Sequence, residues 1–491
     1  METLLHHLLT IARNHPDRIA LRCGTESVRY DDFRARILTT AARLCALGVG
    51  EGDRVMICGG NTLAIPVLYF SVHALGAVAA PIAPDTPESM LIALAGDAEA
   101  RLAVVEKPVS GMPCPVVSPK AATAAAAGEN EIELRCRPDA IADLLYTTGT
   151  SGRKKGVVLT QANALAAARN ITEFVGSGPD DVEVVPLPLS HSFGLGRLRC
   201  MAIAGNTLVL EPGVGTGATV VRRILDTRAT GLALVPAGFD IVRRMTGDVL
   251  GQARDHLRYI EIGSAPMKPE TRSWLTGLLP QTRICHHYGL TEASRAAFTE
   301  YHRDAHKSGT AGRAAPNVEI VVCGENGRRL PTGETGEVVV RGGMVMREYW
   351  KQPELTEQTF CSEGLRTGDI GYVDADGYLF LLGRRSDLIN VGGRKVAPDE
   401  IEDLLRQLDG VKDAGCVGEP DELLGECVKA YLVADREIRL SEIVAFLRTR
   451  VEECKIPQVI ARIESIPRTN SGKIQRQMLR GAKGLAWTSE R

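Results

Sequence analysis

The stretch from Leu144 to Leu159 reads LLYTTGTSGRKKGVVL, in which two apolar runs flank a loop of hydroxyl-bearing residues, glycines and lysines. This pattern predicts a strand, a loop and a second strand. Glycine lets a backbone turn tightly and approach a ligand closely, while hydroxyl groups, free N–H groups and lysines can bind phosphate oxygens. We therefore expect a phosphate-binding loop, with a polar surface turn as the alternative. The loop is not a P-loop, because Gly156 follows Lys155 where that motif requires Ser or Thr.

Length and composition indicate a globular protein of more than one domain. The chain has 491 residues, of which 44% are hydrophobic and 24% are charged, and a single core rarely serves so long a chain. Aromatic residues make up 4% and the formal net charge is −2, so the composition does not favour binding to nucleic acid or anionic membranes. The twelve cysteines include no C-x-x-C pair, which favours reduced thiols over a disulfide framework or a zinc site.

The sequence does not predict a secretory signal or a membrane span. Residues 1–9 lack a sustained apolar run. The most apolar region, residues 67–84, is interrupted by His73, Gly76 and Pro81, so we predict a buried helix followed by a strand. We therefore expect a cytoplasmic protein, either a monomer or a homodimer.

Alternating helical and strand patterns predict the fold class. Residues 19–105 show the alternation typical of an α/β protein with a largely parallel sheet. Residues 318–341 are rich in strand signals, and residues 398–451 again alternate. Charge and glycine content rise between residues 383 and 396, as is typical of a domain joint. We predict a large N-terminal domain, residues 1–382, with mixed, largely parallel sheets and a β-rich subdomain, and a small mobile α/β C-terminal domain, residues 383–491.

A second segment with side chains suited to a nucleotide, residues 286–292, reads HHYGLTE. The ring of Tyr288 can stack on a base, and the hydroxyl group of Thr291 can donate to a phosphate. The carboxylate of Glu292 offers the oxygen ligands that Mg²⁺ prefers. The alternative is a turn before a helix, with Thr291 as the N-cap.

Two further segments also suit a nucleotide. The strand predicted at residues 258–262 ends in small residues, Gly263 to Met267, against which a flat ligand can lie. Asp369 lies between glycines in RTGDIG, where its carboxylate can bind two ribose hydroxyl groups. The alternatives are an ordinary strand-to-helix turn and a surface turn, respectively.

Together with IPRTNSGKI at residues 466–474, these motifs occur in the order typical of the adenylate-forming superfamily, which the chain resembles over nearly its whole length. The signature loop of that family is Tyr-Thr-Ser-Gly-Thr-Thr-Gly-x-Pro-Lys-Gly-Val. This chain departs from it at Thr148, Ser151 and Lys154. The first two departures keep a hydroxyl group, whereas Lys154 replaces a rigid proline with a charge.

The resemblance implies a set of site residues. It assigns catalysis to Lys473, Thr291 and Glu292, and it assigns Mg²⁺ binding to Glu292. The residues implied to bind ATP are Thr147, Thr148, Gly149, Thr150, Ser151, Gly152, Lys155, Gly263, Ser264, Ala265, His287, Tyr288, Gly289, Asp369 and Arg384.

The activity implied by the resemblance has two halves. A carboxylate attacks the α-phosphorus of ATP to give an acyl-adenylate and pyrophosphate, and the thiol of CoA then displaces AMP to give an acyl thioester. Lys473, Thr291 and Mg²⁺ would stabilise the charge that gathers on the α-phosphate. A swing of the C-terminal domain about Ser386 would then replace Lys473 with the loop of Gly392 and Gly393, which lines the thiol tunnel.

The resemblance also implies where the acid binds. The expected pocket residues are His191, Ser192, Phe193, Gly263, Ala265 and Pro266, within a glycine-containing loop and the small-residue turn. Relatives that activate amino acids place Asp at about the position of Ser192, and a neutral hydroxyl group cannot balance a buried ammonium. We therefore expect an aryl or short-to-medium acyl acid, with Phe239 in the pocket wall. For Arg295 we favour a position facing water over contact with a second anionic group.

Other functions fit the sequence less well. One alternative is a stand-alone adenylation enzyme that loads the phosphopantetheine of an acyl carrier protein, so the thiol acceptor stays open. A non-enzymatic nucleotide-binding homologue would not need Lys473, Glu292 and Asp369 together. A dinucleotide dehydrogenase would need a G-x-G-x-x-G motif that opens a helix after the first strand, and no such motif is present.

Overall fold

The chain folds into two compact units. The computed structural model describes residues 2–124, 133–148, 154–215, 217–385, 387–391, 394–421, 424–468, 472–482 and 485–486. Unit 1 comprises Met1–Ile320 and Val340–Leu365, and unit 2 comprises Val321–Val339 and Arg366–Arg491. The small C-terminal domain predicted for residues 383–491 lies wholly within unit 2, and its mobility stays a prediction.

Unit 1 contains a seven-stranded sheet that includes the stretch quoted first. The strand order is β18-β8-β7-β4-β3-β5-β6, with parallel pairing from β7 to β6 and antiparallel pairing of β7 with β8 and of β8 with β18. The strands are β3 (Arg54–Cys58), β4 (Val78–Ile82), β5 (Ala100–Val105), β6 (Val116–Val117), β7 (Ile141–Thr148), β8 (Lys154–Thr160) and β18 (Glu348–Tyr349). The strands predicted on either side of the signature loop are thus confirmed, while residues 149–153 of the loop lie outside the described residues.

Unit 1 also contains a nine-stranded sheet in the order β15-β14-β13-β12-β11-β9-β10-β1-β2. The strands are β1 (Ile19–Cys23), β2 (Glu26–Arg29), β9 (Val182–Val185), β10 (Thr207–Leu210), β11 (Gly231–Leu234), β12 (Tyr259–Ile262), β13 (Arg283–Tyr288), β14 (Ala297–Glu300) and β15 (Arg313–Ala314). The strands from β1 to β13 pair in parallel, and the hairpin β1–β2 and the strands β14 and β15 at the other edge pair antiparallel. The largely parallel α/β architecture predicted from the sequence is confirmed.

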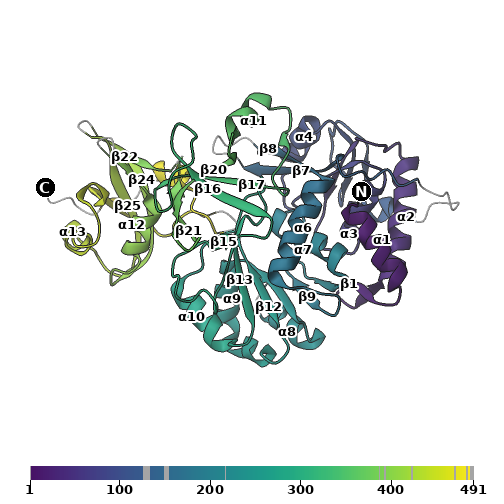
Figure 1. Ribbon diagram of the computed structural model, residues 1–491, viewed down its shortest axis with the longest axis horizontal. Helices are drawn as coiled ribbons and strands as arrows, with labels where there is room; N and C mark the ends of the chain where they lie inside the picture. Colours follow the sequence, from purple (N-terminus) through teal and green to yellow (C-terminus); the bar gives the residue numbers. More distant parts are fainter. Residues whose placement is uncertain are drawn as a thin grey trace. The chain divides into compact units, whose positions relative to one another are not determined.

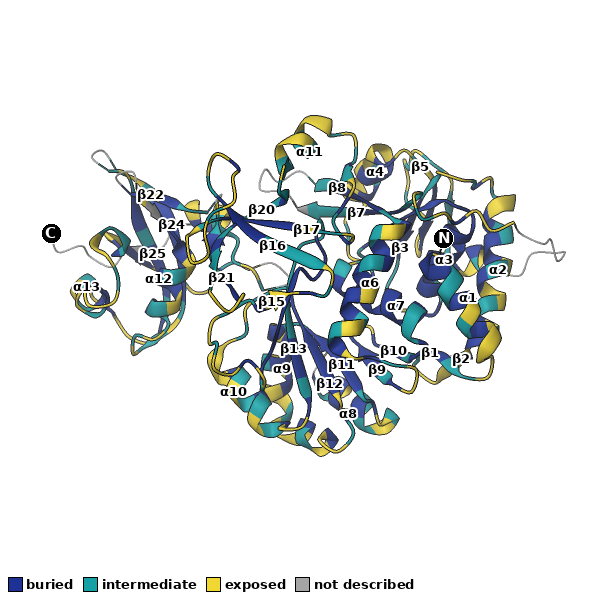
Figure 2. Ribbon diagram, in the orientation of Figure 1, coloured by how far each residue is buried: buried dark blue, intermediate teal, exposed yellow. Residues whose placement is uncertain are grey.

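Helices pack on and between the sheets of unit 1 (Figure 1). They are α1 (Leu4–Asn14), α2 (Tyr30–Ala46), α3 (Ala64–Ala74), α4 (Glu88–Asp97), α5 (Pro119–Ala122), α6 (Gln161–Val175), α7 (Ser192–Ala204), α8 (Ala218–Thr227), α9 (Pro236–Thr246), α10 (Pro269–Leu278) and α11 (Pro353–Thr359), with a 3₁₀ helix at Val249–Ala253. Helix α3 is buried along almost its whole length (Figure 2), because its sequence AIPVLYFSVHA is apolar on every face. Helix α6 starts with a capping box, in which the side chains of Thr160 and Asn163 each accept a hydrogen bond from a backbone N–H at the start of the helix.

Helix α7 joins the two sheets of unit 1 through two fully buried arginines. Arg197 donates to Glu183 of β9 and to Glu261 of β12, both in the nine-stranded sheet. Arg199 donates from Nη2 to Oδ2 of Asp143 on β7 at 2.6 Å, in the seven-stranded sheet. The two arginines are about 200° apart around a helix that turns by about 100° per residue, so they point to nearly opposite sides of α7.

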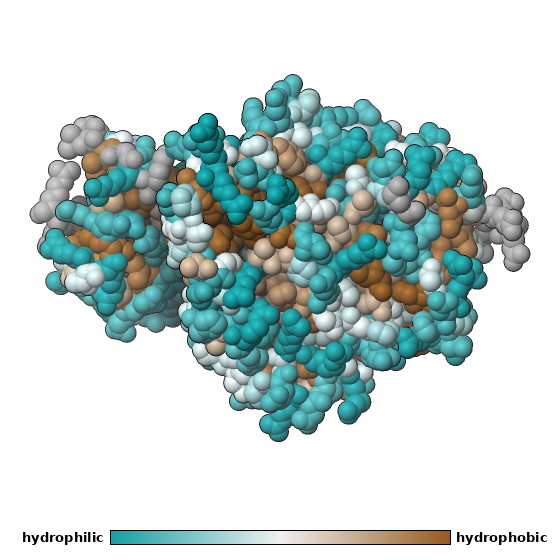
Figure 3. Space-filling view, viewed as in Figure 1, coloured by the Kyte–Doolittle hydropathy of each residue, from teal (hydrophilic) through white to brown (hydrophobic). Residues whose placement is uncertain are grey.

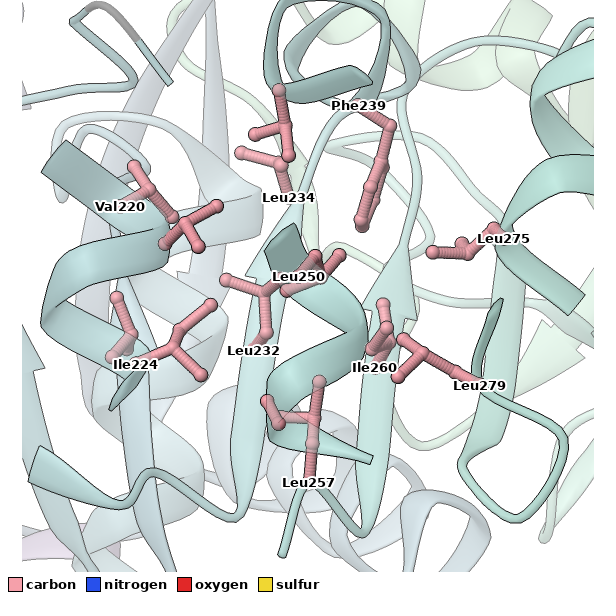
Figure 4. Packing of buried hydrophobic residues seen from close by; sticks show 14 of the residues in the cluster. Val220, Ile224, Leu232, Leu234, Phe239, Leu250, Leu257, Ile260, Leu275 and Leu279 are labelled. Carbon is pink, nitrogen blue, oxygen red and sulfur yellow. The ribbon is translucent and has the colours of Figure 1, made fainter. Parts of the chain in front are cut away.

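A large apolar cluster fills the space between the nine-stranded sheet and helices α8, α9 and α10 (Figure 4). Phe239 of α9 points into this cluster beside Leu250 and Ile260, and its side chain is 0% exposed. The expectation that Phe239 lines the acid pocket is therefore wrong for this structure, because its ring is used in core packing. The outer surface over α10 and its neighbouring loops is mainly hydrophilic (Figure 3).

Unit 2 and the adjoining strands form two further sheets. The five-stranded sheet has the order β16-β17-β20-β19, with β21 paired to β20, and three of its strands have residues in both units. Its strands are β16 (Val318–Cys323), β17 (Gly336–Gly342), β19 (Phe360–Cys361), β20 (Gly364–Val373) and β21 (Leu379–Arg384). The predicted β-rich region is confirmed, and β20 and β21 form an antiparallel hairpin that turns at Asp376 and Gly377.

The last part of unit 2 is a small α/β domain. Its sheet has the order β23-β22-β25-β26-β27, with β24 paired to β25. The elements are β22 (Ile389–Val391), β23 (Arg394–Val396), α12 (Pro398–Leu405), β24 (Val411–Asp421), β25 (Gly425–Ala434), α13 (Leu440–Leu447), a 3₁₀ helix (Glu453–Lys455), β26 (Val459–Arg462), α14 (Arg476–Arg480) and β27 (Leu485–Ala486). Within the described ranges of both units, no helix is long and apolar enough to cross a membrane.

The core position of Phe239 leads to a stability prediction. Phe239→Ala should lower the free energy of unfolding of unit 1 by about 3–5 kcal/mol, because a fully buried ring is lost and a cavity remains. Met245→Ala on the same helix is the control, since that side chain is 58% exposed and should change stability by less than about 0.5 kcal/mol. Urea unfolding followed by circular dichroism measures both variants, and equal losses would contradict the packing described.

Candidate active site

Helix α7 begins within the segment for which a glycine-containing loop was expected. His191 has extended backbone angles and precedes the first helical residue, Ser192. Gly194 lies in the helix, and a Cβ atom there would lie 2.4 Å from the carbonyl oxygen of Pro188. The expectation of a glycine-containing loop at Ser192 and Phe193 is therefore wrong, because both residues lie in the helix, and Gly194 serves close packing there and not a turn.

Arg197 is the centre of a buried network of charges. Its Nε and Nη2 donate to Oε1 and Oε2 of Glu183 at 2.5 and 2.7 Å, and its Nη1 donates to Oε2 of Glu261 at 3.0 Å. The hydroxyl group of Tyr259 donates to Oε2 of Glu183 at 2.9 Å. Such bidentate and charge-assisted contacts offset part of the cost of removing these charges from water.

Arg295 completes the network and does not face water. Its side chain is 2% exposed, and its Nε donates to Oε1 of Glu261 at 3.0 Å. Its Nη1 and Nη2 donate to the carbonyl oxygens of Ser192 and Phe193, each at 2.9 Å. The position in water favoured from the sequence is wrong, because Glu261, 34 residues earlier in the chain, supplies a buried counter-charge.

The network is electrically balanced. Burial alone would raise the pKa of Glu261, but Arg295 and Arg197 hold it well below the usual range of a glutamate. Burial lowers the pKa of His287, although Glu261 opposes this shift from 2.8 Å away. A neutral His287 leaves two arginines against two glutamates, Glu183 and Glu261, so no net charge remains in the compartment.

Two histidines of β13 hold the small-residue turn that follows β12. A Cβ atom on Gly263 would lie 2.0 Å from Cε1 of His287, so the ring lies directly against the glycine backbone. Nε2 of His286 lies 3.0 Å from the carbonyl oxygen of Ala265, and Nδ1 lies 2.8 Å from the hydroxyl group of Tyr301. A carbonyl oxygen only accepts, so Nε2 carries the proton and Nδ1 accepts from Tyr301. Between these contacts, Ser264 has φ +77°, a conformation that non-glycine residues adopt only when their surroundings enforce it.

The segment after β13 does not enter a helix. The chain continues into β14, so the alternative in which Thr291 caps a helix is wrong. The hydroxyl group of Tyr349 donates to Oε1 of Glu292 at 2.7 Å, and the N–H of Met346 donates to the Glu292 carbonyl oxygen at 2.8 Å. These contacts fix both the backbone and the carboxylate of Glu292.

The same tyrosine links Glu292 to the signature stretch. Nζ of Lys155 lies 5.4 Å from the centre of the Tyr349 ring, and Tyr349 pairs with Val157 across strands β18 and β8. Lys155 and Thr147 face each other across strands β8 and β7. Of the signature loop, Gly149, Thr150, Ser151, Gly152 and the side chain of Thr148 lie outside what the structure describes.

His191 immediately precedes α7, and its residue is exposed. Partial burial and the charge of Lys154 both lower the pKa of His191.

In unit 2, Asp369 and Arg384 form an ion pair across β20 and β21, with Oδ1 and Nε 2.7 Å apart. Nη1 of Arg384 also donates to the carbonyl oxygen of Thr367 at 3.2 Å. Lys473 directly precedes Ile474, which forms an isolated β-bridge with Arg468. The predicted hinge and tunnel residues, Ser386, Gly392 and Gly393, lie outside the described part of the chain.

Several residues described above belong to no sequence motif. The sequence did not single out Glu183 and Glu261 of the charge network, or Tyr349 beside Glu292. The signal that could have found the glutamates is a single charge within an apolar strand, VEVV at 182–185 and YIEI at 259–262. A carboxylate with buried neighbours on both sides requires a buried cation, but the sequence does not say which arginine supplies it.

Comparison with protein families matches most of the chain to known families. The AMP-binding enzyme model matches residues 8–350, and the AMP-binding enzyme C-terminal domain model matches residues 400–473. The chain belongs to the AMP-binding enzyme family. The resemblance to adenylate-forming enzymes is thereby confirmed, as is the expectation of an acid–thiol ligase.

The similar proteins are CoA ligases and related enzymes. A long-chain-fatty-acid–CoA ligase of Mycobacterium tuberculosis, FadD13, is 32% identical over 92% of this chain and 92% of its own length. A 2-succinylbenzoate–CoA ligase of Bacillus cereus is 28% identical over 98% of this chain and 99% of its own. The o-succinylbenzoate CoA synthetase of Bacillus subtilis in complex with its acyl-adenylate intermediate has a TM-score of 0.89 and 27% identity, over 99% of each chain. ATP-bound MatB from Rhodopseudomonas palustris has a TM-score of 0.87 and 27% identity, over 98% of each chain.

The buried histidines of β13 lead to a pH prediction. Burial, reinforced by His287, lowers the pKa of His286 to about 4, whereas an unfolded histidine titrates near 6.5. The unfolded chain therefore binds this proton first, so stability is complete above about pH 6.5 and falls by up to about 1.4 kcal/mol per pH unit towards pH 4. His286→Gln should flatten this slope.

Urea unfolding at pH values from 4 to 8 measures the effect. His15→Gln, at an exposed histidine that follows α1, is the control and should leave the slope unchanged. A His286→Gln slope equal to that of the wild type would contradict the assignment.

Proposed function

We propose that this protein is an ATP-dependent acid–thiol ligase that forms an acyl-adenylate and then an acyl-CoA thioester. The observation that carries the proposal is the meeting of two distant motifs, because Tyr349 contacts both Lys155 of the signature stretch and the carboxylate of Glu292. Family membership and the similar CoA ligases support the same reaction class.

The first half-reaction forms one bond and breaks one. A carboxylate oxygen of the acid bonds to the α-phosphorus of ATP, the bond between that phosphorus and the α–β bridging oxygen breaks, and pyrophosphate leaves. Lys473 would stabilise the charge on the α-phosphate, and Thr291 would donate a hydrogen bond to it. In the second half-reaction the sulfur of CoA bonds to the acyl carbon, the thiol proton passes to solvent, and AMP leaves.

The residues proposed to hold ATP have distinct tasks. The turn of Gly263, Ser264 and Ala265, with the segment His287 to Gly289, would bind adenine. Asp369 and Arg384 would bind the ribose. The β- and γ-phosphates would be bound by Thr147, Thr148, Gly149, Thr150, Ser151, Gly152 and Lys155.

The carboxylate of Glu292 fits the role of a magnesium ligand. It accepts a hydrogen bond from the hydroxyl group of Tyr349, and its oxygens are hard ligands of the kind that Mg²⁺ prefers. A similar solved structure, the o-succinylbenzoate CoA synthetase of Bacillus subtilis, is a complex with ATP and magnesium ion. When bound, Mg²⁺ neutralises negative charge on the phosphates.

We propose that the C-terminal domain, residues 383–491, rotates between the two half-reactions. Rotation about Ser386 would withdraw Lys473 and bring the loop of Gly392 and Gly393 to the thiol.

The residue at position 192 bears on the class of acid. Ser192 supplies no carboxylate to balance an α-ammonium group, which supports an aryl or short-to-medium acyl acid over an amino acid. His191, Phe193 and Pro266 would complete the acid contacts.

Pyrophosphate release tests the proposal. The protein is incubated with ATP and Mg²⁺ and with aryl, fatty, dicarboxylic and amino acids in turn, with and without CoA. We expect release with one class of non-amino acid and AMP turnover that depends on CoA. Release that does not respond to CoA would favour a carrier-protein phosphopantetheine, and silence across the panel with ATP still bound would contradict an acid ligase.

Lys473→Ala is the active-site control in this assay. It should lower pyrophosphate release by at least about 100-fold, because a single electrostatic donor to a transition state commonly contributes that much. Thioester formation from a supplied acyl-adenylate should be much less affected. Normal adenylation with a loss of thioester formation would contradict the role proposed for Lys473.

Tyr349→Phe tests the proposed magnesium ligand. The variant keeps the ring beneath Lys155 but loses the hydrogen bond to Glu292, so the Mg²⁺ concentration for half-maximal activity should rise about 10-fold. Tyr30→Phe is the control, since it loses one buried hydroxyl contact, to the carbonyl oxygen of Asn206, and should leave the Mg²⁺ dependence unchanged. An unchanged dependence in Tyr349→Phe would contradict the assignment.

A further inference from the structure

We infer that Arg295 is a positioning residue of the proposed site, and that it acts through Glu261 and the first turn of α7 and not on the acid itself. This inference rests on the proposed function. It concerns one guanidinium that connects three segments: the start of α7, the turn after β12 and the segment after β13.

Each connection is a direct contact. Two N–H groups donate to the carbonyl oxygens of Ser192 and Phe193, in the motif proposed to bind the acid. A third N–H donates to Glu261, whose Oε1 lies 2.8 Å from Nδ1 of His287. The ring of His287 in turn lies against Gly263, so the chain of contacts reaches the turn proposed to bind adenine.

The backbone of Arg295 makes the third connection. A Cβ atom on Gly289 would lie 2.5 Å from the backbone nitrogen of Arg295, so the segment that leads to Glu292 folds directly onto this residue. Arg295 itself has φ +53°, a conformation that is uncommon for a side chain of this size. The position of the segment is therefore coupled to that of the guanidinium.

The guanidinium has little capacity left to bind a substrate anion. It donates to Glu261, Ser192, Phe193 and, at 3.2 Å, the hydroxyl group of Ser294, which uses four of its five N–H groups. The Glu261 carboxylate neutralises its charge. Arg295 therefore fixes the geometry of groups that bind substrates, in contrast to a receptor for a second carboxylate.

Lysine cannot reproduce these contacts. An ammonium group is a point donor, whereas the planar guanidinium reaches a carboxylate on one side and two carbonyl oxygens on another. Arg295→Lys therefore keeps the buried charge next to Glu261 but gives up the contacts to α7. Arg295→Lys therefore tests the contacts to α7 apart from the positive charge next to Glu261.

Binding of ATP in the absence of any acid, measured by calorimetry, is the first readout. Arg295→Lys should weaken ATP binding about 10-fold. It should also lower kcat for every accepted acid by one common factor, with circular dichroism unchanged. Arg223→Lys is the matched control, because Arg223 also donates from Nε to a largely buried glutamate, Glu211, and from Nη1 to a carbonyl oxygen, that of Gly24. It should leave ATP binding and kcat unchanged.

Gly196→Ala tests the same point with every charge in place. A Cβ atom at this position would lie 2.4 Å from Nη1 of Arg295, so it should push the guanidinium away from α7 and weaken ATP binding as Arg295→Lys does. If Arg295→Lys fails to fold, Gly196→Ala still tests whether displacing the guanidinium weakens ATP binding.

Two results would overturn the inference. One is normal ATP binding and kcat in folded Arg295→Lys or Gly196→Ala. The other is a change confined to the KM of acids that carry a second anionic group, which would make Arg295 a substrate receptor. Failure of the proposed function is distinguishable, because it would appear as absence of acid-dependent pyrophosphate release in the wild type while ATP binding still reports on Arg295.

Discussion

Four charged side chains share one buried compartment beneath the candidate site, and the rest of unit 1 is arranged to permit it. Arg197 and Arg295 stand against Glu183 and Glu261, and all four are nearly or fully inaccessible to water. Removing charges from water costs several kcal/mol per ion unless partners meet them with good geometry. The compartment therefore exists only while α7, β9, β12 and the segment after β13 keep one relative position. Because these elements must keep that position, the network also limits where the residues of the candidate site can lie.

Helix α7 contacts both sheets of unit 1 through buried arginines. Arg197 binds the nine-stranded sheet, and Arg199 binds Asp143 in the seven-stranded sheet. Asp143 lies on β7, which runs directly into the signature stretch, while Glu261 lies on β12, which runs into the small-residue turn. One helix thereby fixes the starting points of two segments that are proposed to hold different parts of ATP. Charged pairs do this with more directional precision than apolar packing, because each hydrogen bond has a preferred geometry.

Several details of the site follow from close approach of backbones and rings. His287 lies against Gly263, and His286 holds the carbonyl oxygen of Ala265 through a tautomer fixed by Tyr301. Burial keeps both histidines neutral at physiological pH. A pre-formed and electrically balanced surface of this kind suits a reaction that develops charge on a phosphate, since its dipoles need not reorganise when the charge appears.

The sequence by itself determined the class of fold, the order of the motifs and many of the elements. The strands on both sides of the signature loop, the hairpin β1–β2 and the cap of α6 were all predictable, because apolar periodicity, glycine turns and N-cap chemistry act within a few residues. Lys155, Tyr288 and Glu292 were predictable as a group only through the family resemblance. The tertiary structure alone decided that Arg295 is buried, that Phe239 belongs to the core and that α7 begins at Ser192. Each of these depends on a partner distant in the chain, such as Glu261 for Arg295, and short-range patterns carry no information about which distant residues meet.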